Sequence, residues 1–402
     1  MMKLQSKKQI NQLTLLFAAT YMVSYMTRIN YGAVISEMET ATAFSRSLLS
    51  LAVTGSFITY GAGQIVSGIV GDRCSPKKLV FIGLCVTALM NLLIPVCQDP
   101  YQMLCVWCVN GFAQSFLWPP LVRILATMLR EQDYKEAINK VAWGSSIGTI
   151  VIYLASPVCL SVFGWKSVFV FSALCAGVML FAWNRYACDI GVETKADKAA
   201  APAKTSGALF TPLMFGVMIA IVMQGMLRDG VTTWMPSYIS ETYNLSNAIA
   251  ILTGVVLPVF SILCFQIATK LYTKRLTNPL TCAGLLFCVG TAAALGLVLI
   301  TGKSAGLSVF LSAVLTGCMY GVNLMLNCMI PQYFEKSGMV STVSGVLNSC
   351  TYIGSAASTY GIALLSEKLG WNFTLLSWLV IAVLGTVICF ICIRPWAHKF
   401  DS

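Results

Sequence analysis

Apolar runs of about 20 residues follow one another along the 402-residue chain and are separated by short polar stretches. A helix of this length crosses the hydrocarbon core of a bilayer. The runs predict twelve membrane-spanning helices, at residues 11–32, 47–70, 78–97, 101–128, 136–160, 166–186, 211–239, 247–269, 278–300, 305–330, 339–364 and 371–393. We therefore predict an all-α membrane protein.

One polar stretch is longer than the others. Residues 187–209 include an Ala-, Lys- and Pro-rich segment at 193–204 that has few side chains to bury. It divides the chain into a six-helix bundle at 1–186, a cytoplasmic linker at 187–209 and a second six-helix bundle at 210–402.

The two predicted bundles also repeat certain residues. Pairs separated by 200 or 206 residues are Arg28 and Arg228, Gly164-Trp165 and Gly370-Trp371, and Ile147-Gly148 and Ile353-Gly354. Three matches in the same order indicate duplicated six-helix units with pseudo-twofold symmetry. Because parallel repeats place the substrate site near the middle of the membrane between the bundles, we expect Arg28 and Arg228 to meet there.

Composition agrees with the membrane assignment. The chain is 57% hydrophobic and 10% charged, against about 25% charged residues in soluble domains. The net charge of +11 does not indicate nucleic-acid binding, because 19 of the 26 Lys and Arg lie at the amino terminus, in the loops after even-numbered spans or in the carboxyl tail. The positive-inside rule then predicts a plasma (inner) membrane protein with both termini in the cytoplasm.

No metal centre or cofactor is expected. Most of the 16 cysteines are scattered through apolar spans, where Cys behaves as a small hydrophobe, and Cys105 and Cys108 lack nearby His or Cys partners. The first apolar run is long enough to continue as a span, so no cleavable signal peptide is expected.

Arginine inside a span is costly, by about 2.5–3.5 kcal/mol near the bilayer centre. Arg28 lies in the first span, and Tyr21 and Tyr25 precede it at positions that share its helical face. In the seventh span Gln224, Arg228 and Thr232 share a face in the same way.

Arginine is suited to anions because its planar fork stays charged and binds phosphate through two hydrogen bonds. A buried ion pair is the alternative role, but the predicted spans contain few carboxylates. Asp229 is the exception, and its position next to Arg228 places it on a different helical face.

The end of the second span and the loop that follows carry Gly68, Asp72, Arg73, Lys77 and Lys78 in the pattern G-x-x-x-D-R-x-x-x-[KR]-[KR]. This pattern resembles the signature of the major facilitator superfamily. We expect Asp72 to pair with Arg123, near the cytoplasmic end of the fourth span, and to form a structural latch or gate on that side.

Further motifs resemble the organophosphate:phosphate antiporter family, of the glycerol-phosphate and hexose-phosphate type. The first span carries Tyr-x-x-x-Tyr-x-x-Arg, and the seventh carries an arginine followed by a glycine and Trp-x-Pro. The resemblance implies that the pore is lined by Tyr21, Tyr25, Arg28, Tyr60, Gln64, Gln114, Trp118, Arg228, Tyr320 and Tyr352. Gln224, Asn323, Asn327 and Asn348 are weaker candidates. Pro119-Pro120 is expected to bend its helix at the site.

The sequence also departs from the glycerol-phosphate branch of that family. Gln64 replaces a lysine, Trp143–Ile147 contains no histidine, and Ile29 and Thr233 replace a lysine and an aspartate. The first two changes lower the positive charge of the site. We therefore expect a phosphate-type anion of lower charge, or a different organic anion.

The resulting hypothesis is a non-enzymatic, monomeric transporter that exchanges a small organophosphate or other organic anion for phosphate by alternating access, with Arg28 and Arg228 as an anion clamp. Exchange needs no proton relay, and the spans contain few titratable groups for one. A proton- or sodium-coupled symporter of carboxylates such as sugar acids is one alternative. A sugar-phosphate sensor that does not transport is another.

Overall fold

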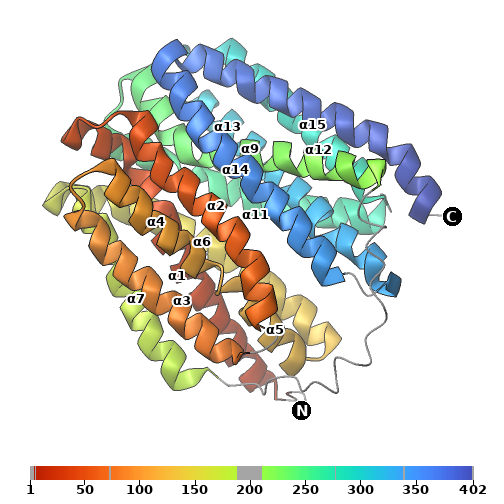
Figure 1. The fold of residues 1–402 in the computed structure, drawn as a ribbon. Coiled ribbons are helices and arrows are strands. Elements are labelled where there is room, and N and C mark those ends of the chain that lie inside the picture. Colours follow the sequence, from red (N-terminus) through yellow and green to blue (C-terminus); the bar gives the residue numbers. More distant parts are fainter. Residues whose placement is uncertain are drawn as a thin grey trace. The chain divides into compact units, whose positions relative to one another are not determined.

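The structure is a computed structural model that describes residues 4, 6–71, 74–187, 211–276, 278–337 and 340–400 (Figure 1). These residues form helices and no β-strand, which confirms the all-α prediction. The helices are α1 (Lys7–Thr42), α2 (Arg46–Gly71), α3 (Pro76–Leu93), η1 (Ile94–Val96), α4 (Pro100–Gln114), α5 (Trp118–Met128), α6 (Glu131–Phe163), α7 (Lys166–Tyr186), α9 (Pro212–Tyr243), α10 (Asn247–Thr253), α11 (Val256–Lys274), α12 (Pro279–Ile300), α13 (Ala305–Asn323), η3 (Leu324–Met329), η4 (Ile330–Ser337), α14 (Val340–Leu369) and α15 (Trp371–Phe400).

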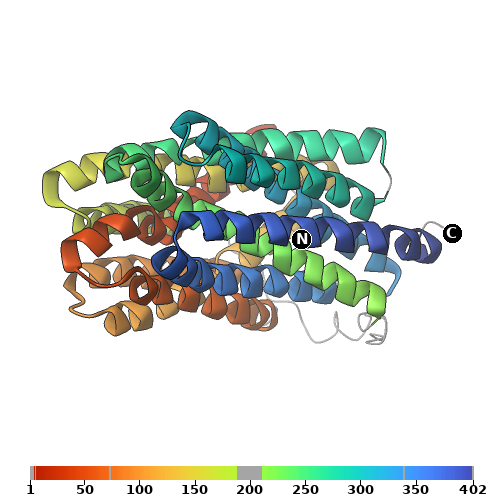
Figure 2. The same ribbon diagram turned by 90° about the horizontal axis from the view of Figure 1, so that it is seen from above.

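The chain forms two compact units, residues 1–198 and 199–402. Their boundary falls within the predicted linker, and residues 188–210 lie outside the described part of the chain. Within each unit the helices run side by side, roughly parallel or antiparallel to one another (Figures 1 and 2).

The same packing order occurs in both units. In the first unit α1 packs on α6, α2 on α4 and α3 on α7; in the second α9 packs on α14, α11 on α13 and α12 on α15. Counted along each half, the first span packs on the fifth, the second on the fourth and the third on the sixth. This shared order agrees with the duplication inferred from the repeated residues.

Helix starts and turns follow local sequence signals. The Asp99 carboxylate accepts hydrogen bonds from the backbone N–H groups of Tyr101 and Gln102 and so caps α4. The turns before the last helix of each unit contain Gly164 and Gly370, whose φ angles are +68° and +80°. Glycine adopts this backbone conformation without the strain that a side chain would add, which explains the repeated Gly-Trp pair.

The fourth predicted span is interrupted, not merely bent. The backbone N–H groups of Ser115, Phe116 and Leu117 bond to carbonyls three residues earlier, and a new helix, α5, begins at Trp118. Pro119 and Pro120 cause the break because neither has an N–H to continue the helical ladder. The matching helix of the second unit, α13, passes into a π-helical turn, η3.

Nine helices in the described part of the chain are long and apolar enough to cross a membrane. The other three predicted spans correspond to α1, to α4 with α5, and to α14. The fourth span is divided into helices of 15 and 11 residues, whereas α1 and α14 are long but rich in polar residues. Arg28 and Tyr352 lie on α1 and α14, so part of the predicted site lies on helices rich in polar residues.

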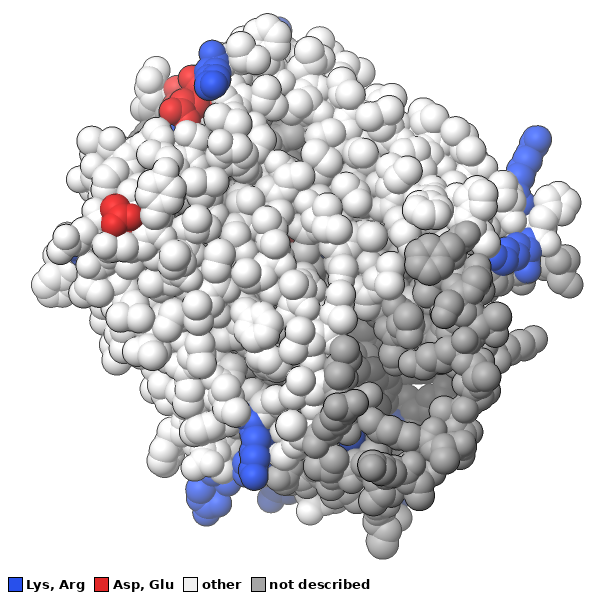
Figure 3. Space-filling view, viewed as in Figure 1, with Lys and Arg blue, Asp and Glu red and all other residues white. Residues whose placement is uncertain are grey.

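The surface suits a lipid environment. Large apolar side chains are exposed along the helices, including Leu15, Phe163 and Val178 at 71%, 80% and 72%. Figure 3 shows one face, whose described part has a broad central area without charged side chains; Lys, Arg, Asp and Glu appear nearer its margins. The structure therefore supports a multi-pass membrane protein.

Candidate anion-binding residues

Close helix contacts fix the position of α1 on α6. A Cβ atom added to Gly148 would overlap the backbone carbonyl oxygen of Met22, and one added to Gly144 would overlap that of Ala18. Only glycine lets the two backbones approach this closely. Arg28 follows the Met22 contact by six residues.

The second unit repeats this arrangement. A Cβ atom added to Gly354 of α14 would overlap the backbone carbonyl oxygen of Val222 on α9. Arg228 follows Val222 by six residues, as Arg28 follows Met22. The two arginines therefore occupy equivalent positions within their own units.

A buried polar face fixes the rotation of α1 about its own axis. The Ser24 hydroxyl donates a 2.6 Å hydrogen bond to Gln114 Oε1, and Gln114 Nε2 donates to Thr27 Oγ1 at 2.9 Å. On the next turn Asn30 Nδ2 donates to Asn91 Oδ1 at 2.7 Å. A satisfied polar network is directional, so it fixes which face of α1 presents Arg28.

Gln114 belongs to this structural network. Its side chain is 1% exposed, and both ends of its amide form hydrogen bonds with α1. The predicted contact with substrate is therefore not favoured, because these bonds would have to break first.

An aromatic group surrounds Arg28. Its guanidinium carbon lies 4.3 Å from the ring centre of Tyr25 and 4.9 Å from that of Tyr60 on α2, which are cation–π distances. Tyr21 packs edge-on against Tyr25 and lies 4.5 Å from Trp118 between ring centres. The structure thus brings together five predicted site residues.

Gln64 lies one turn beyond Tyr60 on α2 and is 9% exposed. Its Nε2 is buried and has no hydrogen-bond partner among the described residues. A buried donor without a partner costs about 1–3 kcal/mol. This donor is consistent with the predicted role of Gln64 in anion binding.

Arg228 is held by its neighbour in the sequence. Its Nε and Nη2 each donate a 2.7 Å hydrogen bond to the Asp229 carboxylate, and Ser355 of α14 donates to the same carboxylate at 2.5 Å. The sequence placed Asp229 on a different helical face from Arg228 and did not predict this pair. Adjacent Cα positions differ by about 100° around a helix, but the long arginine side chain reaches across that angle.

Two tyrosines lie farther from Arg228. Its guanidinium carbon is 5.6 Å from the ring centre of Tyr320 and 6.0 Å from that of Tyr352. Both were predicted site residues, and they come from α13 and α14. The second unit thus combines aromatic rings with a carboxylate around its arginine.

The weaker candidates mainly contribute to packing in the second unit. Gln224 is fully buried and its Nε2 donates to the Met319 carbonyl at 3.1 Å. Asn327 Nδ2 donates to Asn323 Oδ1 at 2.5 Å and to Thr351 Oγ1 at 2.8 Å. Gln224 Oε1 and Asn327 Oδ1 are buried without a partner among the described residues. Asn348 is half-buried on α14, one turn before Tyr352.

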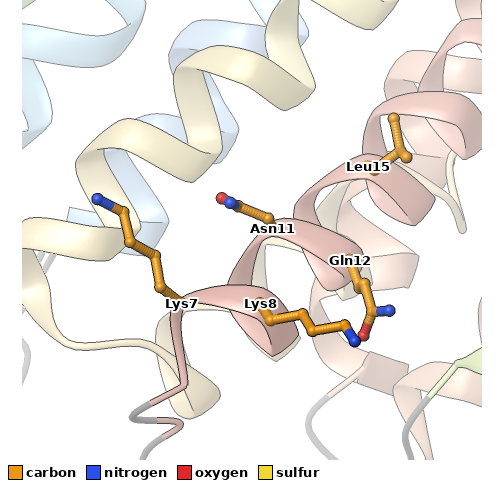
Figure 4. Close-up of a pocket in the computed structure, with 5 residues that line it drawn as sticks. All are labelled: Lys7, Lys8, Asn11, Gln12 and Leu15. Atoms are coloured by element: carbon orange, nitrogen blue, oxygen red, sulfur yellow. The ribbon is translucent and has the colours of Figure 1, made fainter.

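A pocket of about 460 Å³ lies elsewhere, at the beginning of α1 (Figure 4). Its lining residues are Lys7, Lys8, Asn11, Gln12 and Leu15. Along the helix Arg28 is about 20 Å beyond Leu15, from the 1.5 Å rise per residue, so this pocket is separate from the candidate site. Among the described residues no group of His, Cys, Asp and Glu could hold a metal ion.

Residues 17–359 match the Major Facilitator Superfamily. The chain belongs to this superfamily. The resemblance inferred from the loop and helix motifs is therefore confirmed at the level of the superfamily.

Two relatives are organophosphate carriers. The chain is 22% identical over 391 residues to a probable hexose phosphate transport protein of Chlamydia muridarum, covering 88% of this chain and 84% of the relative. It is 23% identical over 386 residues to the glycerol-3-phosphate transporter of Bacillus subtilis, covering 87% and 84%. These relatives are transporters, in agreement with the prediction of a non-enzymatic protein.

A solved structure has a similar fold. It is a bacterial homologue of the human lysosomal transporter Spinster in an inward-facing, occupied conformation, with a TM-score of 0.80 at 14% identity. The match covers 99% of this chain and 100% of that structure.

The structure describes only part of the loop that carries the superfamily signature. Asp72 and Arg73 lie outside the described residues, so the predicted pairing of Asp72 with Arg123 remains a prediction. Arg123 lies on α5 and is partly buried.

Sequence reasoning missed two groups of residues. The pairing of Asp229 could have been anticipated from its adjacency to Arg228, but Ser355 gave no signal because serine is frequent along α14. The polar face of α1 at Ser24, Thr27 and Asn30 was visible as polar residues spaced three apart within an apolar span.

Proposed function

We propose that this protein transports a phosphorylated or otherwise anionic small metabolite across the plasma membrane, in exchange for inorganic phosphate. Arg28 and Arg228 bind the anion in an alternating-access cycle. Lys and Arg placement supports an orientation with both termini in the cytoplasm, and the protein is proposed to act as a monomer within the lipid bilayer.

The equivalence of the two arginines is the observation that carries this proposal. Each follows a glycine–carbonyl contact by six residues on the first helix of its unit, and each lies beside tyrosine rings. A packing role alone gives no reason for a costly cation at both equivalent positions. An anionic substrate does.

The hydrogen-bond donors support phosphate as the recognised group. Asp229 occupies the Nε and Nη2 side of the Arg228 guanidinium, and Nη1 donates no hydrogen bond to another described residue. The Nη1–Nη2 edge can therefore bind two phosphate oxygens, since guanidinium has five N–H donors. Gln64 Nε2 supplies a further donor.

Exchange follows if the bundles close around a bound anion and not around an empty site. Two cations about 10 Å apart repel by about 1–2 kcal/mol at an effective dielectric constant near 20. Asp229 lowers this repulsion, so the substrate must also act through hydrogen bonds. The loaded carrier then changes conformation faster than the empty one.

Proteoliposomes containing the full chain test this function. Uptake of labelled phosphate, glycerol 3-phosphate or glucose 6-phosphate is measured into vesicles loaded with phosphate or with chloride. We expect uptake of phosphate itself into phosphate-loaded vesicles, little uptake into chloride-loaded vesicles, and loss of uptake in Arg28→Gln and Arg228→Gln.

Other outcomes would change the assignment. Equal uptake into both kinds of vesicle would contradict exchange, and uptake driven by a proton or sodium gradient would favour a symporter. Binding of these anions without flux would favour a sensor. Uptake that persists in both arginine variants would contradict the anion clamp.

A further inference from the structure

The Arg228–Asp229 pair has no net charge, although it contains one of the two proposed anion-binding cations. The Arg228 side chain is 9% exposed and the Asp229 side chain 14% exposed. Water therefore screens the Asp229 carboxylate weakly. This carboxylate repels an anion that is bound to Arg228.

The carboxylate is not required simply to keep an arginine in this type of helix. At the position related by the 200-residue repeat, Ile29 follows Arg28, and Arg28 is held beside Tyr25 and Tyr60. Arg228 and Asp229 are neighbours on the same helix, so their ion pair does not link α9 to another helix. The Ser355 hydroxyl connects Asp229 to α14.

We propose that Asp229 determines the charge of the transported anion. It removes one positive charge from the site and so favours singly charged anions, such as phosphodiesters, protonated phosphate monoesters or carboxylates, over doubly charged phosphate monoesters. This inference rests on the proposed function, because it assumes that Arg228 contacts the anion. It identifies a specificity-determining residue and a charge class of substrate.

Two small phosphate esters provide a matched test at pH 8. Dimethyl phosphate carries one negative charge, whereas methyl phosphate carries close to two because its second pKa is about 6. Their affinities for the purified full chain are measured by titration calorimetry in detergent. The quantity compared between variants is the ratio of methyl phosphate affinity to dimethyl phosphate affinity.

Asp229→Asn keeps the shape of the side chain and removes its charge. Each negative charge on the ligand is then no longer repelled by Asp229. The affinity for the doubly charged ester should therefore rise more than the affinity for the singly charged one. We expect the affinity ratio to rise by about tenfold to a hundredfold, from one unit charge about 6 Å away at an effective dielectric constant near 20. Ser355→Ala retains the charge, so both affinities should change by the same factor and the ratio should stay within about twofold.

Ile29→Asp supplies a reciprocal variant. It adds a carboxylate beside Arg28, at the position related to Asp229 by the repeat, and should lower the same ratio by about tenfold or more. This variant keeps the inference testable if Asp229→Asn fails to fold, which size-exclusion chromatography would show.

The outcomes separate this inference from the proposed function. If Arg28→Gln and Arg228→Gln abolish binding but the ratio is unchanged in Asp229→Asn and Ile29→Asp, the charge role of Asp229 is wrong and the anion site stands. If the parent protein binds neither ester, both proposals are wrong. A ratio that changes as much in Ser355→Ala as in Asp229→Asn would assign the effect to geometry and overturn the charge role.

Discussion

Arg28 and Arg228 occupy equivalent positions in the two units, but their surroundings differ. Arg28 lies 4.3 Å and 4.9 Å from the rings of Tyr25 and Tyr60. Arg228 donates two 2.7 Å hydrogen bonds to Asp229, and its nearest described rings are 5.6 Å and 6.0 Å away. The first arginine is placed by aromatic faces and the second by a carboxylate.

The backbone explains part of this difference. Position 25 is Tyr in α1, and the repeat-related position in α9 is Gly225, where a Cβ atom would overlap the Thr351 carbonyl oxygen. The contact of α9 with α14 leaves no room for a ring at that position. The tyrosines near Arg228 therefore come from α13 and α14. The same duplicated frame thus supports two electrostatic environments.

Removing either arginine should have the largest effect on transport. Arg28→Gln and Arg228→Gln should each lower phosphate exchange by about a hundredfold or more, because each removes charge-assisted hydrogen bonds worth about 1.5–3 kcal/mol apiece. Initial rates in phosphate-loaded proteoliposomes measure the effect. Activity above a tenth of the parent in either variant would show that the two arginines do not act together on the anion.

The free energy of unfolding should differ between Arg228→Gln and Arg28→Gln. Arg228→Gln leaves the Asp229 carboxylate without its cation in a largely buried position and should cost about 3 kcal/mol or more. Arg28→Gln loses the cation–π contacts with Tyr25 and Tyr60, worth about 0.5–1 kcal/mol each, and should cost about 1–2 kcal/mol. Thermal unfolding of the detergent-solubilised protein reports both.

The double variant Arg228→Gln with Asp229→Asn provides the control for this stability comparison. Because it removes both charges, it should recover most of the stability without recovering transport. Equal destabilisation by Arg228→Gln and by the double variant would mean that the ion pair does not stabilise the second unit.

The helix contacts should respond alike in the two units. Gly148→Ala and Gly354→Ala each place a methyl group against a backbone carbonyl and should each cost about 1–3 kcal/mol. Gly361→Ala on α14, where no atom lies within 4 Å of the added Cβ, should be neutral or slightly stabilising because Ala favours helix. The unfolding midpoints of the three variants measure these differences in stability. Tolerance at one of the two contact glycines would show that the duplicated frame is not equivalent.

Much of the fold was predictable because it depends on local sequence. The long apolar runs gave the helices, and the repeated Gly-Trp pairs occur where two turns need a positive φ. The interruption before Trp118 was predicted only as a bend. Two successive prolines remove two hydrogen-bond donors, and the depth of the resulting break depends on packing that a sequence does not specify.

Side-chain partners in the candidate site were less predictable than side-chain positions. The helical face shared by Tyr21, Tyr25 and Arg28 follows from periodicity alone. Gln114 was placed near the site, but its hydrogen bonds to Ser24 and Thr27 depend on how α4 packs on α1. Periodicity fixes the direction in which a side chain leaves a helix, but not how far a long polar side chain reaches.

The smallest expected effect concerns the tyrosine rings. Tyr25→Leu and Tyr60→Leu should each weaken anion binding by about two- to fivefold, because each removes a cation–π contact worth about 0.5–1 kcal/mol that places Arg28. Tyr320→Leu and Tyr352→Leu should weaken it by less than about twofold, since Asp229 still holds Arg228 when either ring is lost. The affinities for methyl phosphate measure all four effects, and Tyr→Phe at each position controls for the hydroxyl group. Larger losses at Tyr320 or Tyr352 than at Tyr25 would mean that those tyrosines contact the anion themselves.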